Sequence, residues 1–420
     1  MKYIKKLCFS FFSLILYKLI ICIRPLIQIR FLMIETSAIG HMCEPIETHY
    51  LEKKKTEKSN YKKYLDIYFG ENYVANEFLW KKWKKIFNIK LDNKIFKYIY
   101  KVIFFEAIKK KDQKMLIPFK HNSKILKINF ISEWQQHDTK NILSTHESVI
   151  KLSDSEIDYG MDLLQKYNVN KNDKIILLCV RDPFYTYAKK HNIKNNLYLA
   201  NDKLNLEYSN RDCRIDNFKD LVNFLCKKNY KVFRMGNIMH ERLEFSHQNF
   251  IDYAFEDAKS SFLDLFLFYL SEFTISSGYG LDSMSSLFRK KRIYLNFGEF
   301  SSFNLRLNKN ISFIYPKQVF DNELNKTLNL INIFEKGLHK LKNYNDLKYK
   351  NLELKSLNSQ QMIEAVKDME NYIKSGYSSE LIHKNNQVNK YLYDVFKVRT
   401  DIFWYKKFLN EAYNEIKNNN

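Results

Sequence analysis

The sequence predicts an α/β protein with two doubly wound halves and a helical C-terminal extension. Three observations indicate this fold class. Short apolar segments alternate with amphipathic helical segments from about residue 174 to 300, which is typical of a parallel sheet. The same alternation begins more weakly at Gln28, so we expect a second half with its own first strand. The remaining residues, 355–420, have a helical pattern, and 420 residues suffice for two or three domains.

The first predicted strand is Gln28–Ile34, because its sequence QIRFLMI is short, apolar and contains β-branched side chains. A turn over residues 36–41 follows it. The other elements expected in this half are a strand at 65–69, helices over 76–88 and 94–110, and alternating short strands and loops over 115–150.

The second half is expected to begin with a helix, because Ser153-Asp-Ser-Glu156 matches the capping-box pattern. The strongest predicted strand is 174–180, with the apolar sequence KIILLCV, and it ends at Arg181. The elements expected after the polar loop 184–210 are helices over 216–229 and 261–271, strands at 230–234, Phe273–Ser276 and 292–297, and a helix that begins near Leu281.

The N-terminal segment 1–25 is set apart by a basic start and an apolar run from Leu7 to Ile23, broken only by Lys18. Three interpretations remain open: an amphipathic helix that touches a membrane, a helix packed on the body, and a membrane span. A central lysine costs a span about 2.5–3.5 kcal/mol. We therefore expect four parts: this membrane-touching helix (1–25), an acceptor-side domain (26–165), a nucleotide-binding domain (166–345), and C-terminal helices that pack back on the body (346–420).

The charge balance points to an anionic partner, because 69 Lys and Arg residues exceed 47 Asp and Glu residues by 22. Compositional bias competes as the cause, since the chain is rich in Lys, Asn, Ile, Tyr and Phe, as expected of an AT-rich genome. None of the six cysteines forms a C-x-x-C pair, so we expect no zinc site and no disulfide framework. These features indicate a cytoplasmic protein, held at the inner face of the membrane if the N-terminal helix binds there.

Ligands of open α/β sheets bind at the carboxyl ends of strands, and several of the few glycines fall there, including Gly40, Gly236, Gly278 and Gly280. The turn from Ser276 to Ser283 follows a strand and opens a predicted helix. Backbone N–H groups in such a turn can bind phosphate, and Ser277 and Ser283 would add hydroxyl donors. A tight turn without a ligand is the alternative.

Three further side chains are candidates for chemistry. Arg181 and Arg234 end neighbouring strands, where each guanidinium can bind a diphosphate or, alternatively, form a structural ion pair with an acid such as Asp182. His41 follows the first strand and would face the cleft as a base or as an acceptor-binding group; a structural histidine is the alternative. Asp264 lies on an apolar helix, and we expect it to be a tether rather than a base.

Several motifs are absent from the sequence. It contains no Asp-x-Asp, the commonest carboxylate pair for a metal-bound nucleotide sugar. It also lacks G-x-x-x-x-G-K-[ST], H-E-x-x-H and G-x-S-x-G, which removes support for a P-loop NTPase, a zinc protease and a serine hydrolase. No aromatic-basic RNA motif accompanies the charge, so nucleic acid is not an expected partner.

The order of these short motifs resembles a family of bacterial putative glycosyltransferases encoded with surface-polysaccharide genes. The resemblance covers about residues 29 to 370. Its motifs are Ile39-Gly-His41, Val180-Arg-Asp182, Tyr230-Lys-Val-Phe-Arg-Met-Gly236, Ile251-Asp-Tyr-Ala254, Lys259-Ser-Ser-Phe-Leu-Asp264 and Ser276-Ser-Gly-Tyr-Gly-Leu281. Two positions differ: Arg211-Asp212 stands where the family has Arg-Asn, and Tyr279 replaces a small residue.

The resemblance implies a GT-B-like architecture of two Rossmann-like domains and transfer of a sugar from a nucleotide-sugar donor to a capsule, O-antigen or related glycan, which can be lipid-linked. No metal or other cofactor is expected. His41 is the predicted catalytic residue, and the predicted donor-binding residues are Arg181, Asp182, Arg234, Gly236, Ser276, Ser277, Gly278, Gly280, Ser283 and Glu299. Two alternatives remain: an NAD-type oxidoreductase, in which Glu299 would bind the ribose, and a non-catalytic scaffold of a polysaccharide assembly complex.

Overall fold

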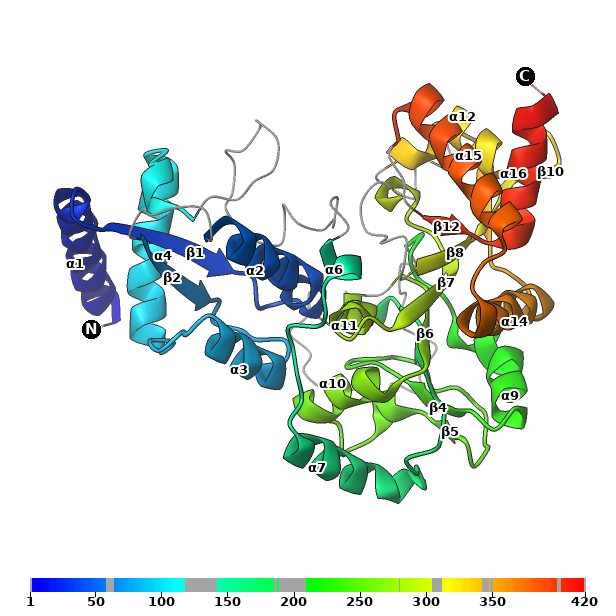
Figure 1. Cartoon of the computed structure of the whole chain (residues 1–420), viewed down its shortest axis with the longest axis horizontal. Helices are drawn as coiled ribbons and strands as arrows, with labels where there is room; N and C mark the ends of the chain where they lie inside the picture. Colours follow the sequence, from blue (N-terminus) through cyan, green and yellow to red (C-terminus); the bar gives the residue numbers. More distant parts are fainter. Residues whose placement is uncertain are drawn as a thin grey trace. The chain divides into compact units, whose positions relative to one another are not determined.

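The computed structural model of the chain describes residues 2–57, 64–117, 142–184, 187–188, 209–278, 280–303, 312–341, 347, 350–398 and 402–418. The chain forms two compact units, Met1–Ile150 and Lys151–Asn420 (Figure 1). Parallel strands and helices occur in both units, and helices dominate the C-terminal region. The predicted α/β fold class is therefore confirmed, while most of the predicted loop 184–210 and of segment 115–150 lies outside the described residues.

The first unit contains a pair of parallel strands, β1 and β2, in continuous register from Gln28 opposite Tyr64 to Ile34 opposite Gly70. Residue Leu116 forms an isolated parallel bridge to Phe31 on β1. The described elements are α1 (Lys2–Ile23), β1 (Gln28–Ile34), η1 (Ile39–Met42), α2 (Glu44–Glu57), β2 (Tyr64–Gly70), α3 (Glu77–Ile86), α4 (Lys94–Lys109), η2 (Gln113–Met115) and α6 (Ile142–Thr145).

The core of the first unit forms where β1 and β2 meet helices α1 and α4. Its fully buried members include Phe31, Phe69 and Phe104, and Tyr17 of α1 belongs to the same cluster. Two helices begin at side-chain caps: the Asn76 side chain accepts a hydrogen bond from Leu79 N, and Asn93 caps α4 in the same way. Helix α2 was not predicted, because its sequence EPIETHYLEKKKTE lacks a continuous apolar stripe.

The described residues of the second unit form a seven-stranded sheet in the order β12-β8-β7-β6-β3-β4-β5, with parallel pairing throughout. From β3 the chain continues to β4 and β5 on one side and later returns to β6, β7 and β8 on the other. The strands are β3 (Ile175–Cys179), β4 (Lys231–Arg234), β5 (Phe250–Ile251), β6 (Phe273–Ser276), β7 (Lys291–Phe297), β8 (Ser312–Pro316) and β12 (Phe403–Trp404).

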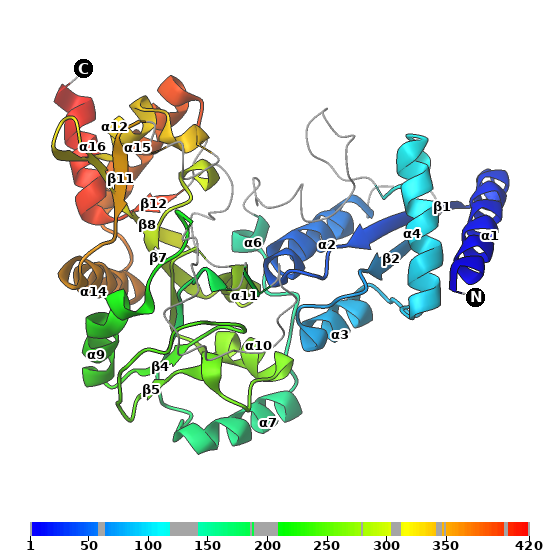
Figure 2. The ribbon, with the colours of Figure 1, turned by 180° about the vertical axis from the view of Figure 1, so that it is seen from behind.

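Helices cover both faces of this sheet (Figures 1 and 2). They bury an apolar core to which all the central strands contribute, as expected for parallel strands covered on both sides. The helices are α7 (Asp154–Leu164), α9 (Lys219–Lys227), α10 (Ser261–Leu270), α11 (Met284–Leu287), α12 (Leu330–Glu335), α14 (Ser359–Ser375), α15 (Ser379–Phe396) and α16 (Lys406–Asn418). Short 3-10 helices are η3 (Gln165–Tyr167), η4 (Ile215–Phe218), η5 (Tyr253–Phe255), η6 (Gly280–Ser283), η7 (Phe300–Ser302) and η8 (Leu338–Lys340).

The C-terminal region packs on the second unit, as the sequence predicts, but it also contributes strands. Strand β12 joins the edge of the main sheet beside β8. A separate antiparallel sheet consists of β9 (Gln318–Asp321), β10 (Lys326–Leu328) and β11 (Leu352–Lys355). The Asn296 side chain at the end of β7 accepts a hydrogen bond from Leu357 N at 2.6 Å, which fixes the chain just before α14.

The boundary between the units differs from the prediction of 165/166. Helix α7 precedes that boundary, yet it belongs to the second unit. Its capping box is present as predicted: the Ser153 hydroxyl accepts from Glu156 N, and the Glu156 carboxylate accepts from Ser153 N. Gly160 lies against the ring of Phe266 on α10, and this close packing ties α7 to the second unit.

We predict that Gly160→Val destabilises the second unit by about 1–3 kcal/mol, as overpacking of a dense core does. A Cβ atom at residue 160 would lie 2.4 Å from the fully buried Phe266 ring. Urea denaturation measures the loss. Asp158→Val places the same side chain on the exposed side of the same helix and is the matched control. Equal stability of the two variants would contradict the packing of α7 on α10.

Candidate functional site

The strand order places a topological switch point between β3 and β6. These strands are neighbours, with Cys179 opposite Ser276, and the chain leaves them toward opposite edges of the sheet. Loops after such strands diverge, so the sheet has an opening at its carboxyl end where ligands of α/β proteins bind. The residues that follow these two strands, Arg181 and Ser277, therefore mark the candidate site.

The loops after β3 and β6 are fastened to each other. The Ser277 backbone N–H donates to the Cys179 carbonyl at 3.1 Å, and the Arg181 backbone N–H donates to the Ser277 hydroxyl at 3.0 Å. Ser277 is buried, so its hydroxyl serves the contact between loops. This arrangement brings the backbone of Arg181 and the glycine turn together.

A buried polar network holds the turn after β6. The Ser276 hydroxyl donates to the Asp282 carboxylate and accepts from Gly278 N at 3.0 Å. Asp282 in turn faces the guanidinium of Arg292 at 3.5 Å and accepts from the Tyr294 hydroxyl at 3.3 Å. Gly278 has a φ of +92°, and a Cβ atom there would lie 3.0 Å from the Phe297 ring, so this position requires glycine.

The helix after this turn is shorter than predicted. Gly280 opens the 3-10 helix η6, and Ser283 precedes the single α-helical turn α11 without making a side-chain cap. A helix of one turn has only a small dipole, so it gives little help in binding phosphate. Anion binding at this edge therefore depends on the side chains around the turn.

Arg181 is oriented by an acid that was not among the predicted site residues. Its Nε lies 2.9 Å from Asp212 Oδ1, and Asp212 also accepts from the backbone N–H and the hydroxyl of Ser209 at 2.8 Å each. Lys317, which follows β8, donates from Nζ to the Asp212 carbonyl at 2.7 Å. Two cations thus meet at the segment 209–212.

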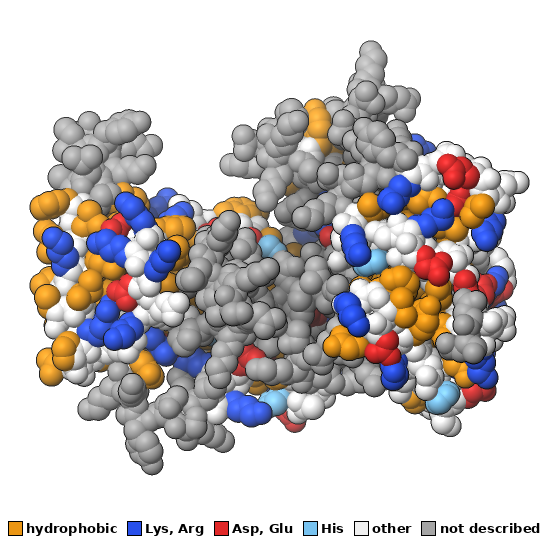
Figure 3. Space-filling view, turned by 90° about the horizontal axis from the view of Figure 1, so that it is seen from above, with side chains coloured by type: hydrophobic (Ala, Val, Ile, Leu, Met, Phe, Trp, Pro, Cys, Tyr) orange, Lys and Arg blue, Asp and Glu red, His pale blue; other side chains and the backbone are white. Residues whose placement is uncertain are grey.

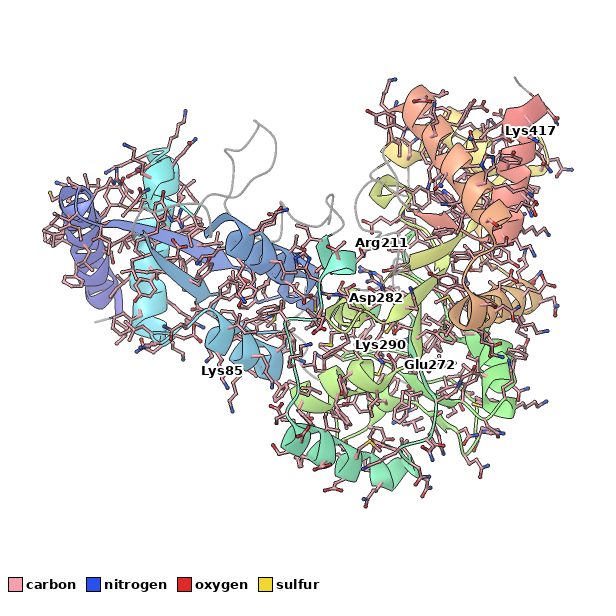
Figure 4. All side chains as sticks on the ribbon, in the orientation of Figure 1. Lys85, Arg211, Glu272, Asp282, Lys290 and Lys417 are labelled. Atoms are coloured by element: carbon pink, nitrogen blue, oxygen red, sulfur yellow. The ribbon has the colours of Figure 1, made fainter. Side chains whose placement is uncertain are left out.

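Arg211 is a second guanidinium at this edge, and the sequence did not single it out as a site residue. Its Nη2 donates to the Gly278 carbonyl at 3.1 Å, and its Nε lies 3.1 Å from Glu299 Oε2 (Figure 4). Gly298 permits this approach, because a Cβ atom there would lie 1.8 Å from the Asn210 carbonyl oxygen. Arg211 therefore joins the turn after β6 to the loop after β7.

The predicted residues around β4 lie in the interior. Arg234 is fully buried, and its Nη1 lies 3.1 Å from Asp252 Oδ2 and donates to the Glu241 carbonyl at 2.6 Å. Asp182 accepts from the backbone N–H groups of Phe184 and His240, and burial raises the pKa of its carboxyl group. These contacts favour the structural alternative for both residues.

Gly236 is also explained by packing. A Cβ atom at this position would lie 2.2 Å from Met239 Cε and 3.3 Å from Ala254 Cβ. The glycine after β4 therefore allows the following loop to fold closely over the strand end. Among the predicted donor residues, those that converge on the switch point are Arg181, Ser276, Ser277, Gly278 and, through Arg211, Glu299.

His41 lies in the first unit, on the short 3-10 helix η1 that follows β1. Its Nδ1 is 2.6 Å from Oε1 of Glu35, the residue directly after the strand, and both side chains are partly exposed. Nearby, Ser37 N donates to Glu71 Oε2 at 3.0 Å, so the ends of β1 and β2 are connected. The sequence predicts His41 but not its carboxylate partner, since six residues separate the two along the chain.

Asp264 has the tether role that the sequence predicts. Its Oδ1 accepts from the Tyr253 hydroxyl at 3.0 Å, which joins α10 to η5. Burial raises the pKa of the Asp264 carboxyl group to about 6, although Tyr253 and Lys259 oppose the shift.

Comparisons with known proteins add three distant structural likenesses. No family model matches the chain, and no curated protein matches its sequence. A glycosyl transferase family 9 protein from Veillonella parvula has 9% identity and a TM-score of 0.40, with 81% of this chain and 96% of that chain covered. The ADP-heptose LPS heptosyltransferase II of E. coli has 10% identity and a TM-score of 0.29, with 63% and 84% covered.

The third likeness is to the UDP-GlcNAc 2-epimerase from Methanocaldococcus jannaschii. It has 13% identity and a TM-score of 0.28, with 81% of this chain and 99% of that chain covered. Because these TM-scores are low, the fold is assigned from the chain's own strand order. In the part of the chain that the structure describes, no group of three or more His, Cys, Asp or Glu side chains is arranged to hold a metal ion.

We predict that Asp264→Asn reduces the pH dependence of stability. The folded-state pKa, about 6, exceeds the ordinary value of 3.8, so the folded wild type binds this proton more tightly than the unfolded chain does. Its stability therefore falls as pH rises from about 4 to 6, by about 2–3 kcal/mol in all. Asn cannot ionise, so the wild type should lose stability relative to the variant over this range in urea denaturation.

Tyr253→Phe provides the companion measurement. It removes a hydrogen bond that favours the ionised carboxylate, so the pKa of Asp264 should rise further and the pH dependence should grow. A stability difference between wild type and Asp264→Asn that stays constant with pH would show that the carboxyl group does not titrate in this way.

Proposed function

We propose that the protein is a glycosyltransferase that binds a nucleotide-sugar donor at the switch point of the second unit and transfers the sugar to a bacterial surface glycan. The observation that carries this proposal is the convergence of Arg181 and Arg211 on the loops after β3, β6 and β7. The sequence resemblance to putative glycosyltransferases of surface-polysaccharide loci supports the substrate class. Independence from metal ions and other cofactors is part of the same proposal.

The arginines supply the charge that a departing nucleoside diphosphate requires. Guanidinium groups bind phosphate oxygens in pairs of parallel hydrogen bonds, and their positions here are fixed in advance by Asp212 and Glu299. Such preorganised charge is usually the largest electrostatic contribution to catalysis. In this proposal Gly278 allows close approach of the phosphates, and Glu299 accepts hydrogen bonds from the ribose hydroxyls.

The acceptor side of the reaction is assigned to His41 and Glu35. Glu35 accepts the Nδ1 proton of His41 and so leaves Nε2 with a lone pair. The acceptor hydroxyl transfers its proton to Nε2 while its oxygen forms a bond to the anomeric carbon. The bond from that carbon to the diphosphate oxygen breaks, and its electron pair leaves on the nucleoside diphosphate, which Arg181 and Arg211 stabilise.

We predict that Arg181→Ala and Arg211→Ala each weaken nucleoside diphosphate binding by about 10- to 100-fold. A hydrogen bond to a charged group contributes about 1.5–3 kcal/mol, and each 1.4 kcal/mol corresponds to tenfold in affinity. A thermal-shift screen of UDP-, GDP-, CMP- and dTDP-sugars identifies the ligand, and calorimetry with the matching diphosphate measures its affinity. Arg214→Ala, at an exposed arginine nearby in the sequence, is the control. Wild-type affinity no better than that of Arg181→Ala would refute the donor site.

We predict that His41→Ala lowers kcat by at least about 100-fold, the usual size of a general-base contribution, and leaves nucleoside diphosphate affinity unchanged. Glu35→Gln should lower kcat by a smaller factor, about tenfold, because Gln still accepts the Nδ1 proton but does not stabilise the imidazolium. Transfer of radiolabelled sugar to glycan acceptor measures both. Glu77→Gln, an exposed acid on α3, should be neutral. Undiminished kcat in His41→Ala would remove this residue from the mechanism, and donor binding without any transfer would favour a scaffold.

A further inference from the structure

Helix α1 has one face that is buried in the first unit. Tyr17 and Ser13 are almost completely buried, and Tyr17 belongs to the core cluster that α4 and β1 form. Its hydroxyl donates to Asp112 Oδ2 at 3.4 Å, and Arg24 forms an ion pair with the same carboxylate. The helix is therefore anchored to the body, as one of the three sequence interpretations expects.

The opposite face of α1 and the residues just after it expose an unusual number of large apolar side chains. Phe11 is 68% exposed, Leu19 53% and Leu26 83%. The full set, which we call the α1 apolar face, is Phe11, Phe12, Leu14, Ile15, Leu19, Ile21, Ile23 and Leu26. Figures 1 and 2 show α4 on one side of α1 and no other described element of the first unit over the opposite side. Contiguous apolar surface of this kind marks an interaction site.

The charge around this face is of one sign. The first 34 residues contain six basic side chains, Lys2, Lys5, Lys6, Lys18, Arg24 and Arg30, and the first acid of the sequence is Glu35. On the side of Figure 3 where the first unit is drawn, Lys and Arg side chains lie among hydrophobic ones. An apolar face with basic neighbours is complementary to a surface that is apolar below and anionic above.

We propose that α1 lies flat on an anionic lipid bilayer, with the α1 apolar face inserted among the lipids. Each fully buried Leu, Ile or Phe side chain would contribute about 1.5–3 kcal/mol and each nearby lysine about 1 kcal/mol. Lys18, the charge within the exposed face, can extend its long side chain to the headgroups. This inference rests on the first unit alone and does not depend on the proposed transfer reaction.

Two other occupants fit the observations less well. A membrane span would require α1 to leave the core contacts of Tyr17 and Ser13, and no helix in the described part of the chain is long and apolar enough to cross a bilayer. A second copy of the chain would place two Lys18 side chains in one apolar interface. Like charges in such a setting repel, whereas anionic headgroups attract them.

The test is co-sedimentation of the full-length protein with vesicles of phosphatidylcholine alone or with about one-third phosphatidylglycerol. We expect binding to the anionic vesicles, weakened by salt, and at least about a tenfold loss of partitioning in the double variant Phe11→Glu, Leu19→Glu. Leu324→Glu, at an exposed leucine of the second unit, is the control and should bind as the wild type does. Circular dichroism and binding of the nucleoside diphosphate verify that the variants are folded.

Three outcomes would overturn the inference. These are wild-type protein that stays in the supernatant with both vesicle types, equal binding by wild type and double variant, and a wild-type dimer in size-exclusion chromatography that the double variant converts to a monomer. The last result would assign the face to a second copy of the chain. Failure of donor binding with intact vesicle binding would refute only the proposed function.

Discussion

The side-by-side pairing of β3 and β6 is the constraint on which the second unit depends. Because the chain leaves these strands in opposite directions, their loops must separate at the carboxyl edge. Polar contacts then close the base of that opening: Arg181 N to the Ser277 hydroxyl, and the Ser276–Asp282 network beneath the glycine turn. The sheet order selects the place, and these contacts fix its shape.

Most of the sheet could be predicted from the sequence, because buried parallel strands are short apolar runs. The predictions at Gln28–Ile34, 174–180 and Phe273–Ser276 all correspond to observed strands. Strand β12 has two residues within a helical pattern, so only its pairing with β8 reveals it. The unit boundary was placed too late, since the capping box at Ser153 shows where α7 begins but not which core it packs against.

The candidate site was only partly predictable, for a related reason. Proximity along the chain identifies a residue at a strand end, such as Arg181 or His41. Their partners Asp212 and Glu35 are found only through three-dimensional contact, and Arg211 reaches the glycine turn from a segment that the sequence marks only as a departure from the family motif. Arg234 shows the converse: a strand-end arginine whose partner, Asp252, holds it inside the protein.

The pairing of each site arginine with an internal carboxylate has a consequence for selectivity. Arg181 with Asp212 and Arg211 with Glu299 bring nearly balanced charge to the switch point. An incoming anion therefore gains only the difference between its own attraction and that of carboxylates already in position. Chloride or a single carboxylate gains little from such an exchange, whereas a diphosphate spans several donors at once. The basic surface then collects anions broadly, and this internal competition decides which of them remain.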